Sequence, residues 1–159
     1  MPRPTCSRWL VTALLVLAAG GCRGPESRAF EELQERGEVA MGVDQYTSTH
    51  VFEPLPDGGR IVLQRDADDP AGTARIRSHM KGIVLAFEGG DFRLPGFVHS
   101  REVPGTAAMA ARRAAIAYSA DTLPRGAQVR IRSTDPEAIR AIHEFLAFQR
   151  RDHRAGAAH

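Results

Sequence analysis

Hydrophobic and polar positions recur with two different periods along this chain. From Thr47 the apolar residues occupy every second position, a Pro- and Gly-containing turn spans residues 54–59, and the alternation resumes through Leu63. This period predicts a β-hairpin. After an Asp-Pro pair at residues 69–70, apolar residues recur at helical spacing until Gly89. An aspartate at the start and a glycine at the end are typical helix caps, so a helix is predicted there.

The same order of elements recurs in the second half of the chain. Alternating positions from Ile116 to Ile131, interrupted by a turn at 123–126, predict a second hairpin, and Asp135 and Pro136 begin a helix that extends to about Arg150. One such ββα unit cannot bury its apolar side alone. We therefore expect an α+β fold, in which two hairpin-helix units form one four-stranded antiparallel sheet with helices on one face.

The connection between the two units is rich in proline and glycine. Residues 91–105 are predicted to be irregular, with a short extended piece at residues 97–99. The alanine-rich residues 106–114 predict a short helix before the second hairpin.

The N-terminus has the pattern of an export signal. Two arginines precede an apolar run over residues 9–19, which is too short to span a bilayer as a helix. Residues 17–22, Leu-Ala-Ala-Gly-Gly-Cys, resemble a bacterial lipobox, in which Cys22 is acylated and becomes the first residue of the exported protein. Ordinary signal cleavage near residues 18–20, which would leave Cys22 free, is the alternative. Residues 1–21 are therefore predicted to be a signal peptide.

Lipidation at Cys22 predicts where the protein resides and how its chain is divided. By resemblance to the usual sorting rule, the arginine that follows Cys22 favours anchoring to the outer membrane, facing the periplasm. Residues 22–37 are expected to be a lipidated tether with one short helix, from 29 to 36, ended by a glycine. A single α+β domain is expected over residues 38–154, followed by a polar tail over 155–159.

Charge and cysteine content narrow the possible partners. The 159 residues include 21 Lys and Arg against 19 Asp and Glu, but Arg3 and Arg8 both belong to the predicted signal. The exported part is therefore neutral, which gives no electrostatic reason to expect a nucleic-acid partner. The chain has 2 cysteines, Cys6 and Cys22, so the folded part contains no free thiol and needs no disulfide.

The candidate chemistry lies in the 6 histidines of the chain. Four are predicted on inward faces: two lie two residues from a phenylalanine in an extended segment, and two lie on the apolar stripes of the long helices. These four are His50, His99, His79 and His143. His153 and His159 lie in the polar tail and are predicted to be solvated.

Buried neutral imidazoles need partners for their ring nitrogens. One explanation is a metal site, because imidazole binds copper, zinc, nickel and iron, and thioethers such as that of Met41 would favour copper(I). The other is that each histidine separately bonds a backbone group at the edge of the core. No HExxH or C-x-x-C-H motif decides between them. The predicted site for copper, zinc or a small ligand consists of His50, His79, His99, His143, Met80 and Met109.

Three functions follow from these features. The first is a non-enzymatic, membrane-tethered envelope lipoprotein that binds a transition metal or small ligand through the inward histidines. The second is a structural or partner-binding lipoprotein without a metal site, which contacts another envelope component through Arg65, Arg130 and Arg132 on the sheet. The third is a hydrolase, which would require a carboxylate close to two of the histidines in an open cleft.

Several short segments also resemble a known family. They are Met41-Gly42-Val43-Asp44-Gln45, Thr49-His50-Val51-Phe52, Gly90-Asp91-Phe92, Phe97-Val98-His99, Pro104-Gly105 before Met109, and Ala141-Ile142-His143-Glu144-Phe145-Leu146. Together they are similar to a family of small exported bacterial proteins of unknown function, and the resemblance covers most of residues 38–153. It implies export but no activity. Relatives of this kind are sometimes labelled aspartate carbamoyltransferase. That label does not fit, because the chain is too short and lacks a Ser-Thr-Arg-Thr-type carbamoyl-phosphate loop.

Overall fold

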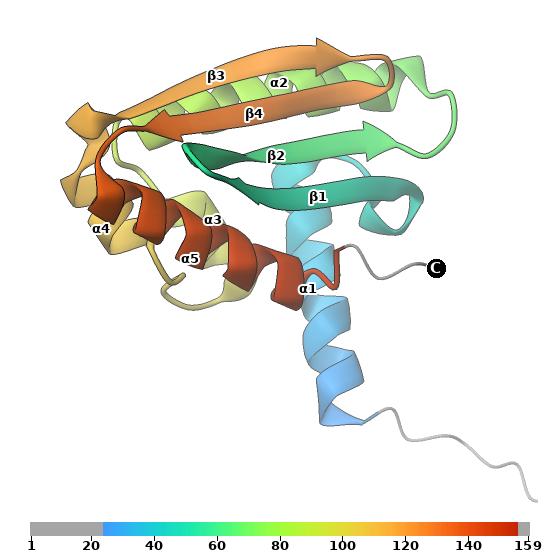
Figure 1. The fold of residues 1–159 in the computed structure, drawn as a ribbon. Coiled ribbons are helices and arrows are strands. Elements are labelled where there is room, and N and C mark those ends of the chain that lie inside the picture. The colour runs from blue at the N-terminus through green and yellow to red at the C-terminus, as the bar shows by residue number, and fades with distance from the viewer. Residues whose placement is uncertain (1–23, 156–159) are drawn as a thin grey trace, which may run out of the picture.

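The structure is a computed structural model that describes residues 24–155. The predicted signal peptide, Cys22 and His159 lie outside the described residues. The elements are α1 (Pro25–Met41), the 3-10 turn η1 (Gln45–Thr47), β1 (Ser48–Leu55), β2 (Gly58–Arg65), α2 (Pro70–Glu88), α3 (Arg93–His99), α4 (Thr106–Ala111), the 3-10 turn η2 (Arg113–Ala115), β3 (Ile116–Leu123), β4 (Gly126–Ser133) and α5 (Pro136–Asp152) (Figure 1). Within residues 24–155, no helix combines the length and apolar character needed to cross a membrane.

The four strands form one antiparallel sheet in the order β1-β2-β4-β3, so the two hairpins meet through β2 and β4 (Figure 1). The register places Ile61 of β2 opposite Phe52 of β1 on one side and Val129 of β4 on the other. Apolar side chains therefore line up across the strands on one face. The α+β fold with a four-stranded antiparallel sheet, predicted from the repeated pattern, is confirmed.

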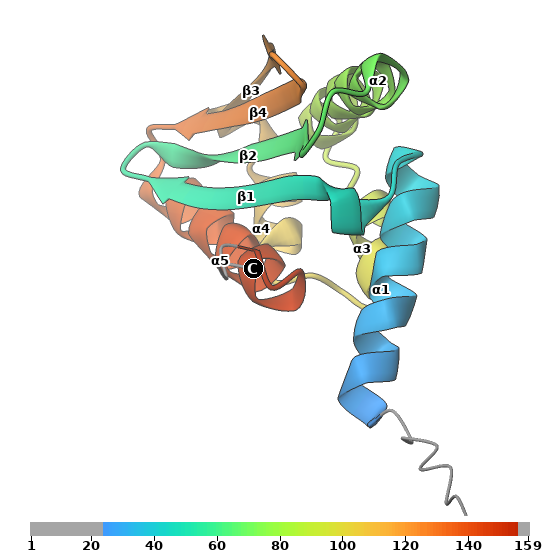
Figure 2. The same ribbon diagram turned by 90° about the vertical axis from the view of Figure 1, so that its right-hand side faces the viewer.

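Each long helix packs on the strands of the other unit. Helix α2 follows the first hairpin but contacts mainly β3 and β4, and α5 follows the second hairpin but contacts mainly β1 and β2 (Figures 1 and 2). Ile76 of α2, Ile142 of α5 and Val129 of β4 are all fully buried in one core. Because the helices are exchanged in this way, neither ββα unit has a complete core without the other.

Both predicted Asp-Pro helix starts are confirmed. The Asp69 carboxylate accepts the backbone N–H of Gly72 at 2.9 Å, and the Asp135 carboxylate accepts that of Glu137 at 2.8 Å. These bonds satisfy N–H groups that have no partner within the helix.

Helix α1 is longer than predicted, because Gly37 does not end it. A Cβ atom at residue 37 would lie 1.2 Å from Nε2 of Gln45, so the missing side chain leaves room for the Gln45 amide beside the helix. The helix ends instead at Gly42, which has a φ of 73° and donates its N–H to the Glu38 carbonyl. The left-handed conformation at Gly42 is the usual helix stop that glycine permits.

The connection between the units is more helical than predicted. The expected extended piece at residues 97–99 is wrong, because these residues end helix α3. The Asp91 carboxylate accepts the N–H of Arg93 at 2.9 Å, and Pro95 lies in the first turn, where its missing N–H costs no hydrogen bond. The predicted helix over 106–114 forms only as far as Ala111 and is followed by η2.

Candidate functional site

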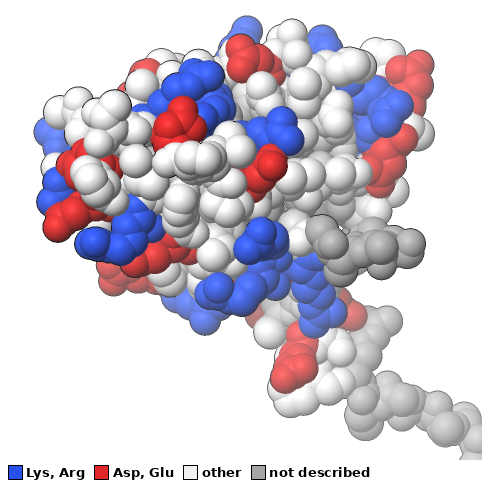
Figure 3. All heavy atoms as spheres, in the orientation of Figure 1, with Lys and Arg blue, Asp and Glu red and all other residues white. Residues whose placement is uncertain are grey.

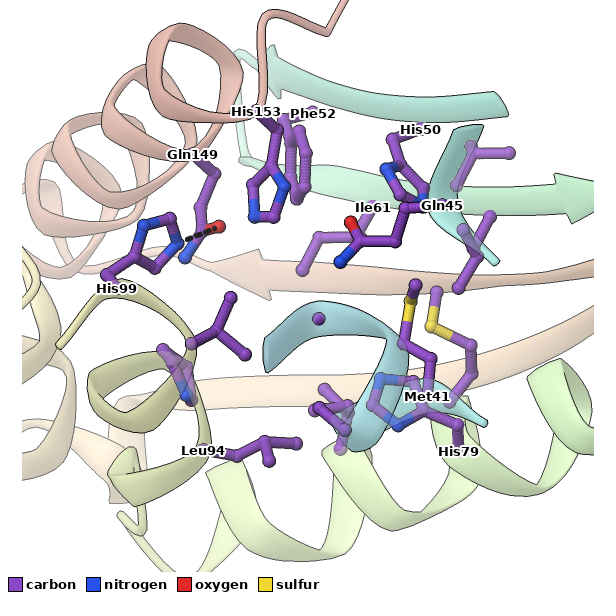
Figure 4. A pocket seen from close by; sticks show the side chains of 18 of the residues that line it. Met41, Gln45, His50, Phe52, Ile61, His79, Leu94, His99, Gln149 and His153 are labelled. Carbon is purple, nitrogen blue, oxygen red and sulfur yellow. Dashed lines mark hydrogen bonds between the residues drawn. The ribbon is translucent and has the colours of Figure 1, made fainter. Parts of the chain in front are cut away.

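An apolar pocket lies between the inner face of β1 and β2 and the helices α1, α2, α3 and α5 (Figure 4). Its volume is about 100 Å³. Among the described residues that line it, none carries a carboxylate, ammonium or guanidinium group. The polar side chains in its wall are the imidazoles of His50, His79, His99 and His153 and the amides of Gln45 and Gln149.

Two of these imidazoles have a nitrogen without a partner. His50 projects from β1 and His153 follows the end of α5, and their ring centroids lie 5.8 Å apart in an edge-to-face arrangement (Figure 4). The His153 ring also stacks on Phe52 at 5.5 Å. Nε2 of His50 and Nδ1 of His153 are both buried and have no hydrogen-bond partner within residues 24–155. Such atoms are rare in folded proteins, because burying an unpaired polar group is costly.

Burial keeps both of these imidazoles neutral. Desolvation lowers the pKa of His50 to about 4, although the Asp66 carboxylate opposes the shift. Desolvation, with repulsion from His50 and His99, lowers the pKa of His153 to about 3. At neutral pH, each ring therefore presents one N–H donor and one lone pair.

Gln45 adds a third unpaired atom to the pocket wall. Its Nε2 donates to the backbone carbonyl of Gln34 at 2.9 Å, which fixes the amide beside Gly37. Its Oε1 is buried without a partner among the described residues. The amide points toward the space between His50 and His153 (Figure 4).

His99 is held in a network that occupies both of its ring nitrogens. Nδ1 lies 2.5 Å from the Asp152 carboxylate, and Nε2 lies 2.9 Å from the side-chain oxygen of Gln149. Asp152 also accepts a hydrogen bond from Arg101 at 2.9 Å. His99 therefore ties α3 to the end of α5 and has no free nitrogen for a ligand.

His79 occupies the other end of the pocket. It projects from α2 and lies beside Met41, on the opposite side of the pocket from His99 (Figure 4). Burial lowers the pKa of His79, and an interaction with the backbone of Ala40 opposes that shift.

The structure brings together only part of the predicted histidine site. His50, His79, His99 and Met80 line the pocket, whereas His143 and Met109 do not. The Nε2 atom of His143 pairs with the carbonyl of Leu55 at 2.9 Å, because its side of α5 faces the end of β1. Met109 lies fully buried in the core on α4.

His153 was predicted to be solvated, and this prediction is wrong. Its N–H continues the last turn of α5 by bonding to the Gln149 carbonyl at 2.9 Å, and Arg154 then adopts a left-handed φ of 51°. This ending holds the imidazole between Phe52 and His99. The sequence signal is faint: His153 lies four residues after Gln149, which is itself four after Phe145 on the buried stripe of α5.

The donor set does not form a conventional metal centre. Within residues 24–155, no group of three or more His, Cys, Asp or Glu side chains is placed to hold a metal ion. The arrangement predicted for a hydrolase is not met either, because His99 is the one pocket histidine paired with a carboxylate in the described part of the chain.

No family model, curated protein or solved structure matches this chain. The resemblance to a family of small exported proteins therefore stays a prediction.

Proposed function

We propose that this chain is an exported, lipid-anchored binding protein of the bacterial envelope, and that its ligand is a small uncharged molecule held in the histidine pocket. The observation that carries the proposal is the pair of buried, unpaired nitrogens, His50 Nε2 and His153 Nδ1, in a pocket whose walls are mainly apolar. Because unpaired buried polar atoms cost free energy, a ligand that pairs with them gains affinity and specificity together.

The volume of the pocket limits the size of the ligand. At about 100 Å³, the pocket is somewhat smaller than an engineered cavity of about 150 Å³ that accepts benzene. A single ring or a short branched chain, or the corresponding part of a larger molecule, matches this space.

The walls of the pocket limit the chemistry of the ligand. No lining residue that the structure describes carries a carboxylate, ammonium or guanidinium group, so an ionised ligand would lose its hydration without gaining an ion pair to such a group. Oε1 of Gln45 can only accept a hydrogen bond, whereas each neutral imidazole can accept one at its unprotonated nitrogen. The ligand is therefore an apolar body carrying one or two hydroxyl or N–H groups.

The walls of the pocket also disfavour a divalent metal as the ligand. A divalent cation in this pocket would find neutral nitrogen and sulfur donors and no negative charge in the described lining. His99, which the sequence placed in a metal site, already uses both of its nitrogens. A small uncharged molecule needs no negative charge in the pocket wall and can pair with one or more of the three unpaired atoms.

Binding of phenol and toluene tests the proposal, because the two rings differ by one hydroxyl group. Side-chain ¹⁵N NMR of the histidines should show phenol perturbing His50 and His153, with a Kd below about 1 mM, a value within reach of ligands of this size. Phenol should bind about fivefold more tightly than toluene, because a neutral hydrogen bond contributes roughly 1 kcal/mol.

Two variants distinguish the hydrogen bonds of the histidines from the apolar contacts of the pocket. His50→Phe combined with His153→Phe keeps the apolar surface and should abolish the advantage of phenol over toluene. His143→Gln, outside the pocket, should leave that advantage unchanged. Equal binding of phenol and toluene by the unsubstituted protein, or binding that leaves the signals of both His50 and His153 in place, would contradict the proposal.

The lipid anchor is tested separately. Labelled palmitate should be incorporated in bacterial cells that produce the full chain, and Cys22→Ala should prevent it. Export without incorporation of the label would show that ordinary signal cleavage operates instead.

A further inference from the structure

A second cleft lies between the N-terminal half of α1 and the C-terminal end of α5. Its volume is about 450 Å³, and it is separate from the histidine pocket, with His99 contributing to the walls of both. In two perpendicular views, this half of α1 extends away from the sheet (Figures 1 and 2). The cleft therefore lies beside the helix with which the described chain begins.

The α5 side of the cleft has a net positive charge, because Arg101, Arg151 and Arg154 line it together with the carboxylate of Asp152, which accepts a hydrogen bond from Arg101. Arg154 follows α5 in a left-handed conformation and places its guanidinium over the ring of Phe30, 4.1 Å from the centroid. Arg101 lies over the ring of Phe148 at 4.8 Å. Stacked guanidinium groups keep N–H donors at their edges, where an anion can bind. Arg151 is exposed on the same side and has no ion-pair partner that the structure describes.

The α1 side of the cleft has a net negative charge, because it carries the carboxylates of Glu26 and Glu32 and the guanidinium of Arg36. Glu26 and Glu32 are both exposed on α1 and line the cleft. Glu32 lies 3.7 Å from Arg36, whose Nε already donates to the carbonyl of Val98 at 2.8 Å. On the surface, basic atoms gather over the end of α5 and acidic atoms of α1 lie next to them (Figure 3). The cleft therefore has opposite charges on its two sides.

We propose that this cleft binds the headgroup of an ammonium-bearing phospholipid. Arg151 and Arg154 contact the phosphate, and Glu26 and Glu32 contact the ammonium group. A purely anionic headgroup would satisfy the arginines but be repelled by the glutamates. A zwitterion pairs with both sides of the cleft. If its cation is a primary ammonium group, the N–H groups can also donate hydrogen bonds to the carboxylates.

The length of chain before α1 identifies the lipid surface as the source of this zwitterion. This step rests on the proposed lipid anchor at Cys22. Two residues separate Cys22 from Pro25, the first residue of α1. At about 3.5 Å per residue, the start of α1 lies within roughly 11 Å of the anchor. The cleft is then held at the level of the lipid headgroups.

Vesicle binding tests the proposal without the anchor. The test uses residues 22–159 with Cys22→Ser, which keep every described element and the whole core. Cosedimentation is measured with phosphatidylcholine vesicles, alone or mixed with phosphatidylethanolamine or phosphatidylglycerol. Binding should be strongest with phosphatidylethanolamine, and Arg151→Glu with Arg154→Glu should weaken it by up to about fivefold per arginine, the most that an exposed ion pair contributes.

A charge reversal on the acidic side gives the sharper result. Glu26→Lys should shift the preference from phosphatidylethanolamine to phosphatidylglycerol. Glu144→Lys makes the same change of charge on an exposed part of α5 outside the cleft and should leave the preference as it was. Circular dichroism checks that each variant is folded.

Three outcomes would overturn the proposal. They are stronger binding of the unsubstituted protein to phosphatidylglycerol, an equal effect of Glu26→Lys and Glu144→Lys, and saturable binding of soluble phosphoethanolamine without any vesicle binding. Because phenol binding to the histidine pocket is measured independently, loss of vesicle binding alone leaves the proposed function standing.

Discussion

Replacing Gly37 with alanine tests the structure of the pocket wall, because we expect the protein to lose stability where such a replacement usually increases it. An alanine in place of glycine inside a helix normally stabilises a protein by about 1 kcal/mol. At Gly37 the new Cβ would occupy the position of the Gln45 amide, 1.2 Å from its Nε2. Gln45 must therefore move and lose its 2.9 Å hydrogen bond to the Gln34 carbonyl.

The size of the effect follows from these two contributions. A buried amide deprived of its partner costs about 1–3 kcal/mol, against which the gain in helix propensity is about 1 kcal/mol. Gly37→Ala should therefore destabilise the domain by about 1 kcal/mol, which lowers its Tm by roughly 4 °C. Urea and thermal unfolding, followed by circular dichroism, measure both values.

Gly82 is the matched control, because it lies inside α2 and a Cβ there would have no atom within 4 Å. Gly82→Ala should stabilise the domain by about 1 kcal/mol. In a Gln45→Ala background, Gly37→Ala should also become stabilising, because the obstructing side chain is gone. If Gly37→Ala stabilises the unsubstituted protein as Gly82→Ala does, the description of this wall is wrong.

Two further predictions concern the histidines and the helix caps. The unfolded chain takes up protons near pH 6.5, whereas His50 in the folded state does so only near pH 4 and His153 near pH 3. The free energy of unfolding should therefore fall as pH drops from about 6.5 toward 4. In urea titrations at fixed pH values, His50→Phe should make this fall less steep. An unchanged dependence of the free energy of unfolding on pH would contradict the burial of His50. Asp69→Ala removes the hydrogen bond to Gly72, and Asp135→Ala removes the one to Glu137. Each should lower the free energy of unfolding in urea by about 1 kcal/mol. Asp69→Asn should keep most of the stability, because asparagine also caps helices.

The fold could be predicted because its signals are local. Alternation along the hairpins and an Asp-Pro pair before each long helix are encoded within a few neighbouring residues. In the structure, α2 and α5 each pack on the strands of the other unit. No local sequence pattern predicts this exchange. Gly37 illustrates the difficulty, since a glycine near the end of a helical pattern looks like a stop until Gln45 is known to pack against it.

The site was predicted in part for the same reason. His50 and His79 face inward because they share a strand face or helix stripe with buried residues, a property of local periodicity. His143 also lies near the apolar stripe of α5. Because that stripe is broad, a residue at its edge can face another part of the fold, and His143 pairs with the Leu55 carbonyl instead of lining the pocket. His153 enters the pocket through contacts with Phe52 and His99, which are distant in sequence.

A crystal structure of the protein with phenol would show directly whether His50 and His153 hold a ligand in the pocket. The phenol ring should lie in the pocket between β1 and α5, with its hydroxyl about 2.8 Å from Nε2 of His50 or Nδ1 of His153. Phenol bound elsewhere, with ordered water molecules pairing both nitrogens in the pocket, would contradict the claim that these imidazoles serve to hold a ligand.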